Sequence, residues 1–131
     1  MKRKYLTSPT ACNLYKVKIK EDEVRPDSDW SLCLIIRDEE KANELITEIC
    51  SILEKYKDRC KWTGDKRYFY VTTGYASHFR NMHIIKGRIK SKQAAEMSQR
   101  YNYFETKADA EELLQELKNI FREFDFAFEK D

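Results

Sequence analysis

The chain has 131 residues, of which 37% are charged and 41% hydrophobic, and its formal net charge is +2 at pH 7. This length suits one domain that buries its own core, and the apolar content excludes a disordered tail. The N-terminus starts Met1-Lys2-Arg3 without an apolar run of signal-peptide length, and nowhere do about 18 apolar residues stand together. We therefore expect a soluble intracellular protein.

The first third of the chain alternates between irregular and strand-like patterns. Residues 1–12 have no clear period and include a loop at residues 7–10, whereas residues 13–20 alternate apolar and basic side chains as a half-exposed strand does. An acidic, proline-containing loop follows at residues 21–29. The apolar run at residues 30–36 then predicts a central strand.

Two amphipathic helices repeat one pattern. Asp38 is the expected N-cap of the first helix, and Glu39 and Glu40 suit its first turn. The apolar stripe of this helix recurs at a constant offset of 68 residues. Its members are Ala42, Leu45, Ile46, Ile49, Ile52, Leu53 and Tyr56, and the second set is Ala110, Leu113, Leu114, Leu117, Ile120, Phe121 and Phe124. We therefore expect two strand-and-helix units, at residues 30–56 and 101–124, inside a single domain of residues 1–131.

Further strands are expected at residues 66–73 after a Gly64-Asp65 turn, at 83–89 and at 101–105, with a short helix at 91–99 capped by Ser91 and a period-two stretch at 124–128. The order of the long elements predicts an α+β fold. In it an antiparallel sheet carries two amphipathic helices on one face, as in a ferredoxin-like β-α-β-β-α-β sandwich with an extra N-terminal strand. The other sheet face is expected to be free. Another two-layer α+β arrangement remains the alternative.

The polar residues do not assemble a familiar catalytic or metal site. His78 and His83 lie five residues apart without a nucleophile-elbow or Cys-His signature, and the three glycines stand singly rather than in a phosphate-binding loop. The four cysteines, Cys12, Cys33, Cys50 and Cys60, contain no Cys-x-x-Cys pair, so we expect reduced structural thiols rather than metal ligands or disulfides. We expect no enzyme, no cofactor and no metal.

Residues 57–92 hold almost all of the positive charge, with ten Lys and Arg against two Asp, whereas residues 1–56 carry −1 and residues 93–131 carry −5. Aromatic residues are interleaved with the cations. The candidate partner-binding residues of this basic stretch are Lys61, Trp62, Lys66, Arg67, Tyr68, Tyr70, Arg80, Lys86, Arg88 and Lys90.

Three interpretations fit this stretch. Lys and Arg that hold phosphates, beside aromatic rings on which bases stack, are typical of binding to RNA or single-stranded DNA. The same charge suits an acidic protein surface or a nucleoprotein. Alternatively the rings are core and the charges a solvated rim, because alternate strand residues point to opposite faces and at most one pair among Tyr68–Val71 is free.

The segment Tyr101-Asn102-Tyr103-Phe104-Glu105-Thr106-Lys107-Ala108-Asp109-Ala110-Glu111-Glu112-Leu113-Leu114 resembles the C-terminal unit of many small uncharacterised proteins of bacteriophages and mobile elements. This resemblance implies an anti-defence inhibitor in the bacterial cytoplasm that acts by occluding a host protein or nucleoprotein, such as a CRISPR effector or another defence nuclease. A direct nucleic-acid binder and a homodimeric accessory protein are the alternatives.

Overall fold

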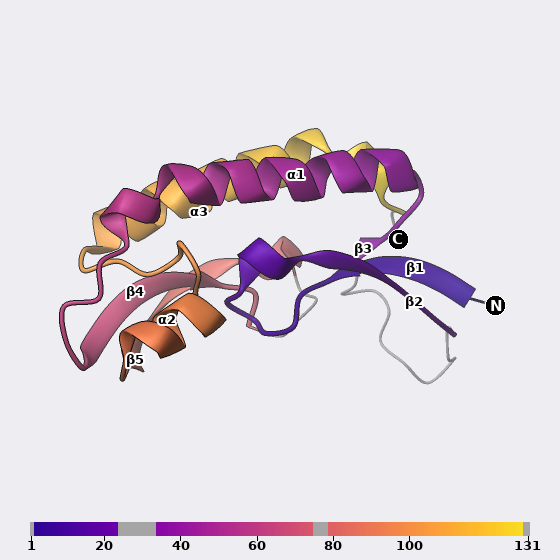
Figure 1. Cartoon of the computed structure of the whole chain (residues 1–131). Coiled ribbons are helices and arrows are strands. Elements are labelled where there is room, and N and C mark those ends of the chain that lie inside the picture. The colour runs from indigo at the N-terminus through magenta and orange to yellow at the C-terminus, as the bar shows by residue number, and fades with distance from the viewer. Residues whose placement is uncertain (1, 24–33, 75–78, 130–131) are drawn as a thin grey trace.

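A computed structural model describes residues 2–23, 34–74 and 79–129 (Figure 1). The helices and strands, in chain order, are β1 (Lys2–Thr7), β2 (Lys18–Glu23), β3 (Leu34–Ile35), α1 (Glu39–Lys55), β4 (Lys66–Thr72), β5 (His83–Ile89), α2 (Lys92–Ser98) and α3 (Lys107–Glu123). The predicted α+β class is confirmed.

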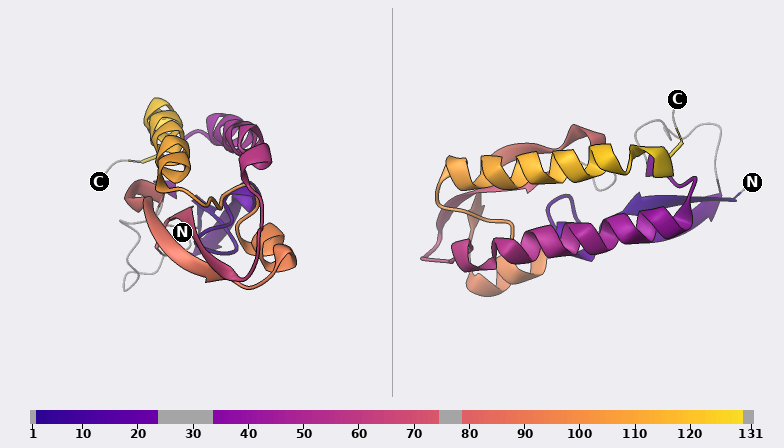
Figure 2. Two further views of the ribbon diagram at one scale, coloured as in Figure 1. Left: turned by 90° about the vertical axis from the view of Figure 1, so that its left-hand side faces the viewer. Right: turned by 90° about the horizontal axis from the view of Figure 1, so that it is seen from above.

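Helices α1 and α3 have 17 residues each and begin 68 residues apart, as the repeated stripe predicts. The side chains of Asp38 and Thr106 cap them by accepting hydrogen bonds from the backbone N–H groups of Lys41 and Asp109. The two helices lie side by side and run in opposite directions (Figures 1 and 2). Their facing stripes form the main core; its buried helix positions are Ala42, Leu45, Ile49, Leu53, Ala110, Leu113 and Leu117.

The described strands form two antiparallel sheets, where the sequence predicted one. The first has the order β2-β1-β3 and the second consists of β4 and β5. Both lie on the same side of the α1–α3 layer (Figure 1). The described strands support the α+β architecture, whereas the ferredoxin-like strand order stays a prediction.

Two isolated bridges connect the strand-and-helix units to each other. Ile36, just before α1, bridges Phe128, which follows α3. Phe104, just before α3, bridges Phe69 in β4, with both N–H to carbonyl distances at 2.8 Å. In each unit, the residue before the helix thus pairs with a segment that follows the helix of the other unit.

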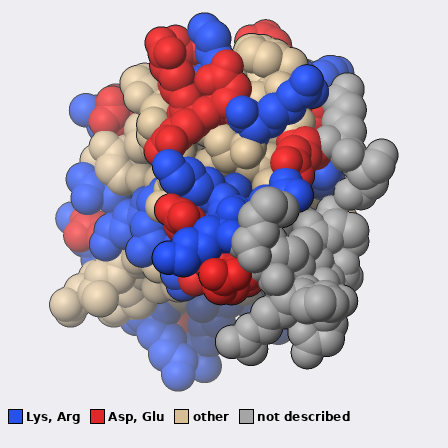
Figure 3. All heavy atoms as spheres, turned by 90° about the vertical axis from the view of Figure 1, so that its right-hand side faces the viewer, with Lys and Arg blue, Asp and Glu red and all other residues tan. Residues whose placement is uncertain are grey.

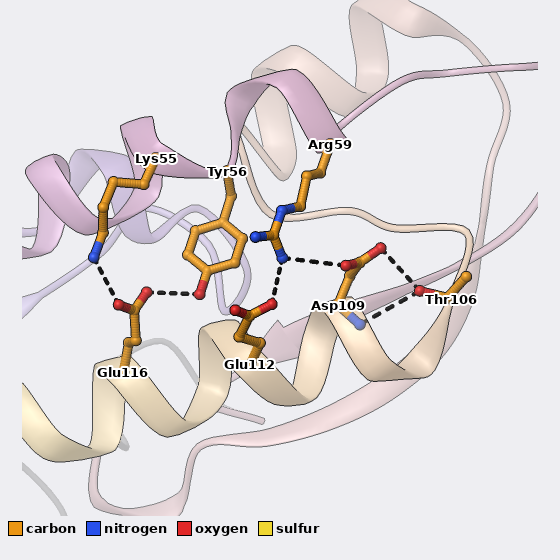
Figure 4. A network of polar contacts seen from close by, with 7 residues as sticks. All are labelled: Lys55, Tyr56, Arg59, Thr106, Asp109, Glu112 and Glu116. Atoms are coloured by element: carbon orange, nitrogen blue, oxygen red, sulfur yellow. Dashed lines mark hydrogen bonds and ion pairs between the residues drawn. The ribbon is translucent and has the colours of Figure 1, made fainter.

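Polar side chains join the end of α1 to the start of α3 (Figure 4). Arg59 contacts the carboxylates of Asp109, at 3.2 Å, and Glu112. Glu116 accepts hydrogen bonds from Lys55 Nζ and the Tyr56 hydroxyl, both at 2.6 Å. The network fixes the C-terminal end of one helix against the N-terminal end of the other.

Helix α2 covers the side of the β4–β5 sheet that faces away from α1 and α3 (Figure 2). Ser91 caps it by accepting from the Ala94 N–H, as predicted. Beneath it lies a second buried cluster of Tyr68, Ile89, Ala95 and Tyr103. Strand β4 is therefore packed on both faces, because Val71 belongs to the main core on the opposite face. The sheet face expected to be free is covered in this region.

Several predicted boundaries differ from the structure. Residues 14–16 form a 3-10 helix, so the strand predicted at 13–20 starts at Lys18 and extends to Glu23. Strand β1 lies within residues 1–12, which have no clear period; in its pairing with β2, Lys2 and Lys4 stand opposite Glu23 and Glu21, and opposite charges favour such a pair.

Near the C-terminus, residues 125–127 form a 3-10 helix rather than a strand, and the 101–105 strand is reduced to the Phe104 bridge. Residues 30–33 of the predicted central strand, including Cys33, lie outside the described residues.

Candidate interaction surface

In the basic stretch, the charged and the aromatic side chains differ in exposure. All ten of its Lys and Arg side chains are exposed. Tyr68, Tyr70 and Phe79 are buried, with exposed fractions of 0%, 8% and 1%, and Trp62 and Phe69 are partly buried. Tyr75 and His78 lie outside the described residues. The cations therefore point outward while the described aromatic rings point inward.

Burial removes Tyr68 and Tyr70 from the predicted stacking surface. The Tyr68 hydroxyl accepts from the Thr63 N–H and donates to the Gly64 carbonyl, both at 2.8 Å, and its ring meets Tyr103 edge-on at 5.7 Å. Tyr70 lies against Gly87, where an added Cβ would stand 2.2 Å from the tyrosine hydroxyl oxygen. Both tyrosines build the sheet instead of offering a face to a base.

Trp62 also has a structural environment. Its indole Nε1 donates to the Ile89 carbonyl at 3.1 Å, and its ring packs on the cluster beneath α2. Of the ten predicted binding residues, the seven cations remain accessible for a partner, and the three aromatic residues hold the sheet and α2 together.

Three cations share one face of the β4–β5 sheet. Arg67 stands directly opposite Arg88 in the antiparallel register, and Lys86 stands opposite Phe69, with its Nζ 4.9 Å from the centre of that ring. Like charges directly opposite each other across two strands destabilise a sheet. Both side chains are exposed, and the hydrogen bonds of Arg88 to Asp65 offset part of this repulsion.

The cations differ in how far neighbouring carboxylates neutralise them. Arg88 donates two hydrogen bonds to Asp65, at 2.7 and 2.8 Å, which hold the pKa of that carboxyl below its ordinary value. Lys66 lies 3.3 Å from Glu105, and Arg80 lies 3.8 Å from Asp125. In contrast, Lys61, Arg67 and Lys90 make no ion pair with a described residue.

We call Arg67, Lys86, Arg88 and Lys90 the cationic patch. Lys90 belongs to the patch because its charge helps to lower the pKa of Asp65 and because it lines one shallow hollow together with Arg88. Within this patch Asp65 compensates one of the four charges.

The opposite end of the molecule is basic as well, but its charges are more fully paired. Figure 3 shows Lys and Arg side chains gathered on the end where β1 begins. Arg3 pairs with Glu129, Lys4 lies 2.8 Å from Glu39, and Lys20 lies 3.8 Å from Asp22. The cationic patch is therefore the stronger candidate for an anionic partner.

The described residues include one histidine, His83, and the free cysteines Cys12, Cys50 and Cys60. His83 is exposed on β5, with its Nδ1 2.8 Å from the Asn81 carbonyl. Burial raises the pKa of Cys60 to about 12, so its thiol stays protonated near neutral pH. Among residues 2–23, 34–74 and 79–129, no three His, Cys, Asp or Glu side chains gather as metal ligands would.

Within the same described segments, no helix combines the length and the apolar character needed to cross a bilayer. The chain matches no family model, no curated protein and no solved structure.

Proposed function

We propose that this chain is a binding protein that docks its cationic patch on the acidic surface of a nucleic-acid-handling protein or nucleoprotein and inhibits it by occlusion. The observation that carries the proposal is the opposed pair of Arg67 and Arg88, whose side chains are both exposed. A like-charge pair weakens the sheet, and Asp65 neutralises Arg88 but makes no ion pair with Arg67. An anionic partner would neutralise the remaining charge of Arg67.

The burial of the aromatic rings supports a partner bound through charge. Binders of single strands gain about 1–3 kcal/mol for each base stacked on an aromatic side chain. Tyr68 and Tyr70 cannot supply this energy while they are buried. Direct binding to RNA or single-stranded DNA would then rely on phosphate contacts alone, which makes it the second candidate.

A homodimer formed along the outer edge of β5 is disfavoured by the same charges. An antiparallel second copy centred on Gly87 would place Lys86 directly across from Arg88 of the other copy. Charged residues on an edge strand oppose such pairing. The cationic patch therefore favours a partner of opposite charge over a second copy of this chain.

The setting we propose is a bacterial cytoplasm, where the chain acts as a phage-type anti-defence protein. This part rests on the resemblance of residues 101–114 to small phage proteins. A protein without a catalytic group can inhibit a defence nuclease by covering the surface on which the nuclease holds its nucleic acid.

The proposal is tested by charge reversal at two exposed cations that form no ion pair with a described residue. We expect the tagged chain to recover a protein partner from nuclease-treated bacterial lysate, and the double variant Arg67→Glu/Lys90→Glu to lose it. Lys118→Glu is the matched control, because Lys118 is exposed on α3 and has no ion pair with a described residue.

Recovery of nucleic acid without protein would overturn the proposal in favour of direct binding. That outcome is checked by titrating a labelled RNA strand at increasing salt. Phosphate contacts release counterions from the strand, and this release favours binding less at higher salt, so binding through phosphates weakens steeply. Equal recovery by the double variant and the control would remove the cationic patch from the function. Circular dichroism of each variant shows whether the fold is retained.

A further inference from the structure

A cleft of about 430 Å³ lies between the end of α1, helix α2 and the chain that follows α2. Its volume is within the range of pockets that hold small molecules, about 300–1,000 Å³. The residues that line it are Lys57, Asp58, Cys60, Lys92, Glu96, Arg100, Tyr101 and Tyr103. Half of this lining belongs to the basic stretch, and the other half lies outside it.

Three cations reach the cleft from three segments. Lys57 belongs to the 3-10 helix after α1, Lys92 is the first residue of α2, and Arg100 follows α2. None of the three makes an ion pair with a described residue. The cleft therefore offers three cationic donors that form no ion pair with a described residue, although the charge of Glu96 acts on Arg100.

Arg100 is held in place by two aromatic rings. Its guanidinium carbon lies 4.8 Å from the centre of the Tyr15 ring and 5.1 Å from that of Tyr101. One of its nitrogens donates to the Tyr101 hydroxyl at 3.3 Å. A guanidinium fixed in this way loses little conformational entropy when it binds a phosphate bidentately.

The wall at Tyr101 has an unusual backbone. Tyr101 has a φ of +59°, a left-handed conformation that costs a bulky residue about 1–2 kcal/mol. The fully buried Asn102 fixes the chain here, because its side-chain amide bonds both the N–H and the carbonyl of Val71, at 2.9 and 2.8 Å. The result is that the Tyr101 ring stands at the edge of the cleft, 5.3 Å from Tyr15.

Two carboxylates, those of Asp58 and Glu96, add hydrogen-bond acceptors to the cleft. Asp58 and Glu96 are exposed, and neither forms an ion pair with a described residue. Carboxylates accept hydrogen bonds from hydroxyl and amine groups. The Cys60 thiol is neutral because burial raises its pKa, and burial also raises the pKa of Tyr103, so neither adds negative charge at neutral pH.

We propose that this cleft binds a nucleoside monophosphate group. Lys57, Lys92 and Arg100 hold the phosphate, Asp58 and Glu96 accept from the ribose hydroxyls or base amines, and the Tyr101 ring contacts the base. A nucleotide combines an anion, hydroxyl or amine donors and a flat ring, which are the three features that the cleft complements. The group is either a free nucleotide or the phosphorylated end of a strand.

The test is calorimetric titration of the full chain with each of the four nucleoside monophosphates, with adenosine and with inorganic phosphate. We expect a monophosphate to bind at least about tenfold more tightly than adenosine or phosphate, because each supplies part of the contacts. Equal affinity for adenosine and its monophosphate, or no binding by any nucleotide at millimolar concentration, would overturn the proposal.

The matched variants are Lys57→Gln/Lys92→Gln, at the cleft, and Lys61→Gln/Lys90→Gln, which removes two exposed lysines of the basic stretch that do not line it. The first is expected to weaken nucleotide binding by about tenfold or more and the second to leave it unchanged. Thermal unfolding checks that both remain folded. An equal loss of nucleotide affinity in both variants would show that only the overall positive charge matters, and would contradict a specific site in the cleft.

The two sources of the group are separated with oligonucleotides of about ten nucleotides, with or without a 5′-phosphate. Tighter binding of the phosphorylated strand than of the free nucleotide assigns the cleft to strand ends, whereas binding of the free nucleotide alone assigns it to a small ligand. The variant Arg67→Glu/Lys90→Glu should still bind nucleotides. Failure at the cleft is therefore distinguishable from failure of the proposed function.

Discussion

At the scale of single residues, Cys60 illustrates how burial decides what a side chain can do. Its thiol lies at the cleft, and burial raises its pKa to about 12, while the Tyr103 hydroxyl donates to its carbonyl oxygen at 3.1 Å. The thiolate is the reactive form of cysteine, so this shift suppresses reactivity. We expect alkylation of Cys60 at pH 8 to be slower in the folded than in the unfolded chain by on the order of a hundredfold.

Peptide mapping by mass spectrometry after iodoacetamide treatment measures this rate. Cys50 serves as the internal comparison, because it is partly exposed and burial raises its pKa less strongly. The chain in urea supplies the unfolded reference. Alkylation of Cys60 as fast as that of Cys50 would contradict the prediction. Because the pKa of Cys60 is raised in the folded chain, the folded state keeps the thiol proton at a pH at which the unfolded chain loses it. The stability that depends on the protonated thiol is therefore lost as pH rises from about 9 towards 12.

At the scale of elements, the junction between α1 and α3 depends on Glu116 (Figure 4). Burial raises the pKa of this carboxyl, but hydrogen bonds from Lys55 and Tyr56 outweigh the effect and leave the pKa below its ordinary value. Tyr56 is 3% exposed, so its hydroxyl has little access to water in place of Glu116. We expect Tyr56→Phe to lower the free energy of unfolding by about 1 kcal/mol, measured by urea titration at pH 7.

Tyr15→Phe is the matched control. The Tyr15 hydroxyl also donates to a glutamate, Glu54, at 2.7 Å, but this pair is exposed. Water replaces that bond, and the expected loss is within about 0.5 kcal/mol. The pKa of Glu116 is lower in the folded chain than in the unfolded chain, so the ionised carboxylate stabilises the fold above about pH 4.5. The difference in stability between the wild-type chain and Tyr56→Phe should therefore shrink as the pH falls below about 4.5. Equal losses in the two variants would show that burial of the junction is unimportant.

The elements also show what the sequence could reveal. The long helices were predictable because their stripe and caps, such as Asp38 and Thr106, lie within one element. Strand β1 was not predictable, because the Lys2-Arg3-Lys4 run has no apolar alternation and its β2 partners lie 17 to 21 positions away in the sequence. The inward position of Tyr68 depends on α2 packing over the sheet, and that contact leaves no local pattern. Arg100 and Tyr101 were missed for the same reason.

At the scale of the whole molecule, the two bridges make each strand-and-helix unit depend on the other. Ile36 and Phe104 each pair with a segment that follows the helix of the opposite unit. Loss of one helix would therefore remove packing and backbone pairing from both sheets. We expect a single cooperative unfolding transition, in which circular dichroism and tryptophan fluorescence give the same midpoint.

Leu45→Ala and Leu113→Ala test this dependence with substitutions at equivalent positions. Both leucines are 0% exposed and lie 68 residues apart, one in α1 and one in α3. Each variant is expected to lose about 2–5 kcal/mol in urea titration and to keep one transition with an unchanged slope, because both cavities open in the shared core. Glu111→Ala, an exposed change on α3, should stay within about 0.5 kcal/mol. If Leu113→Ala instead gave separate transitions for helix content and fluorescence, the units would fold independently, and the bridges would be minor contacts rather than the connection that makes them one folding unit.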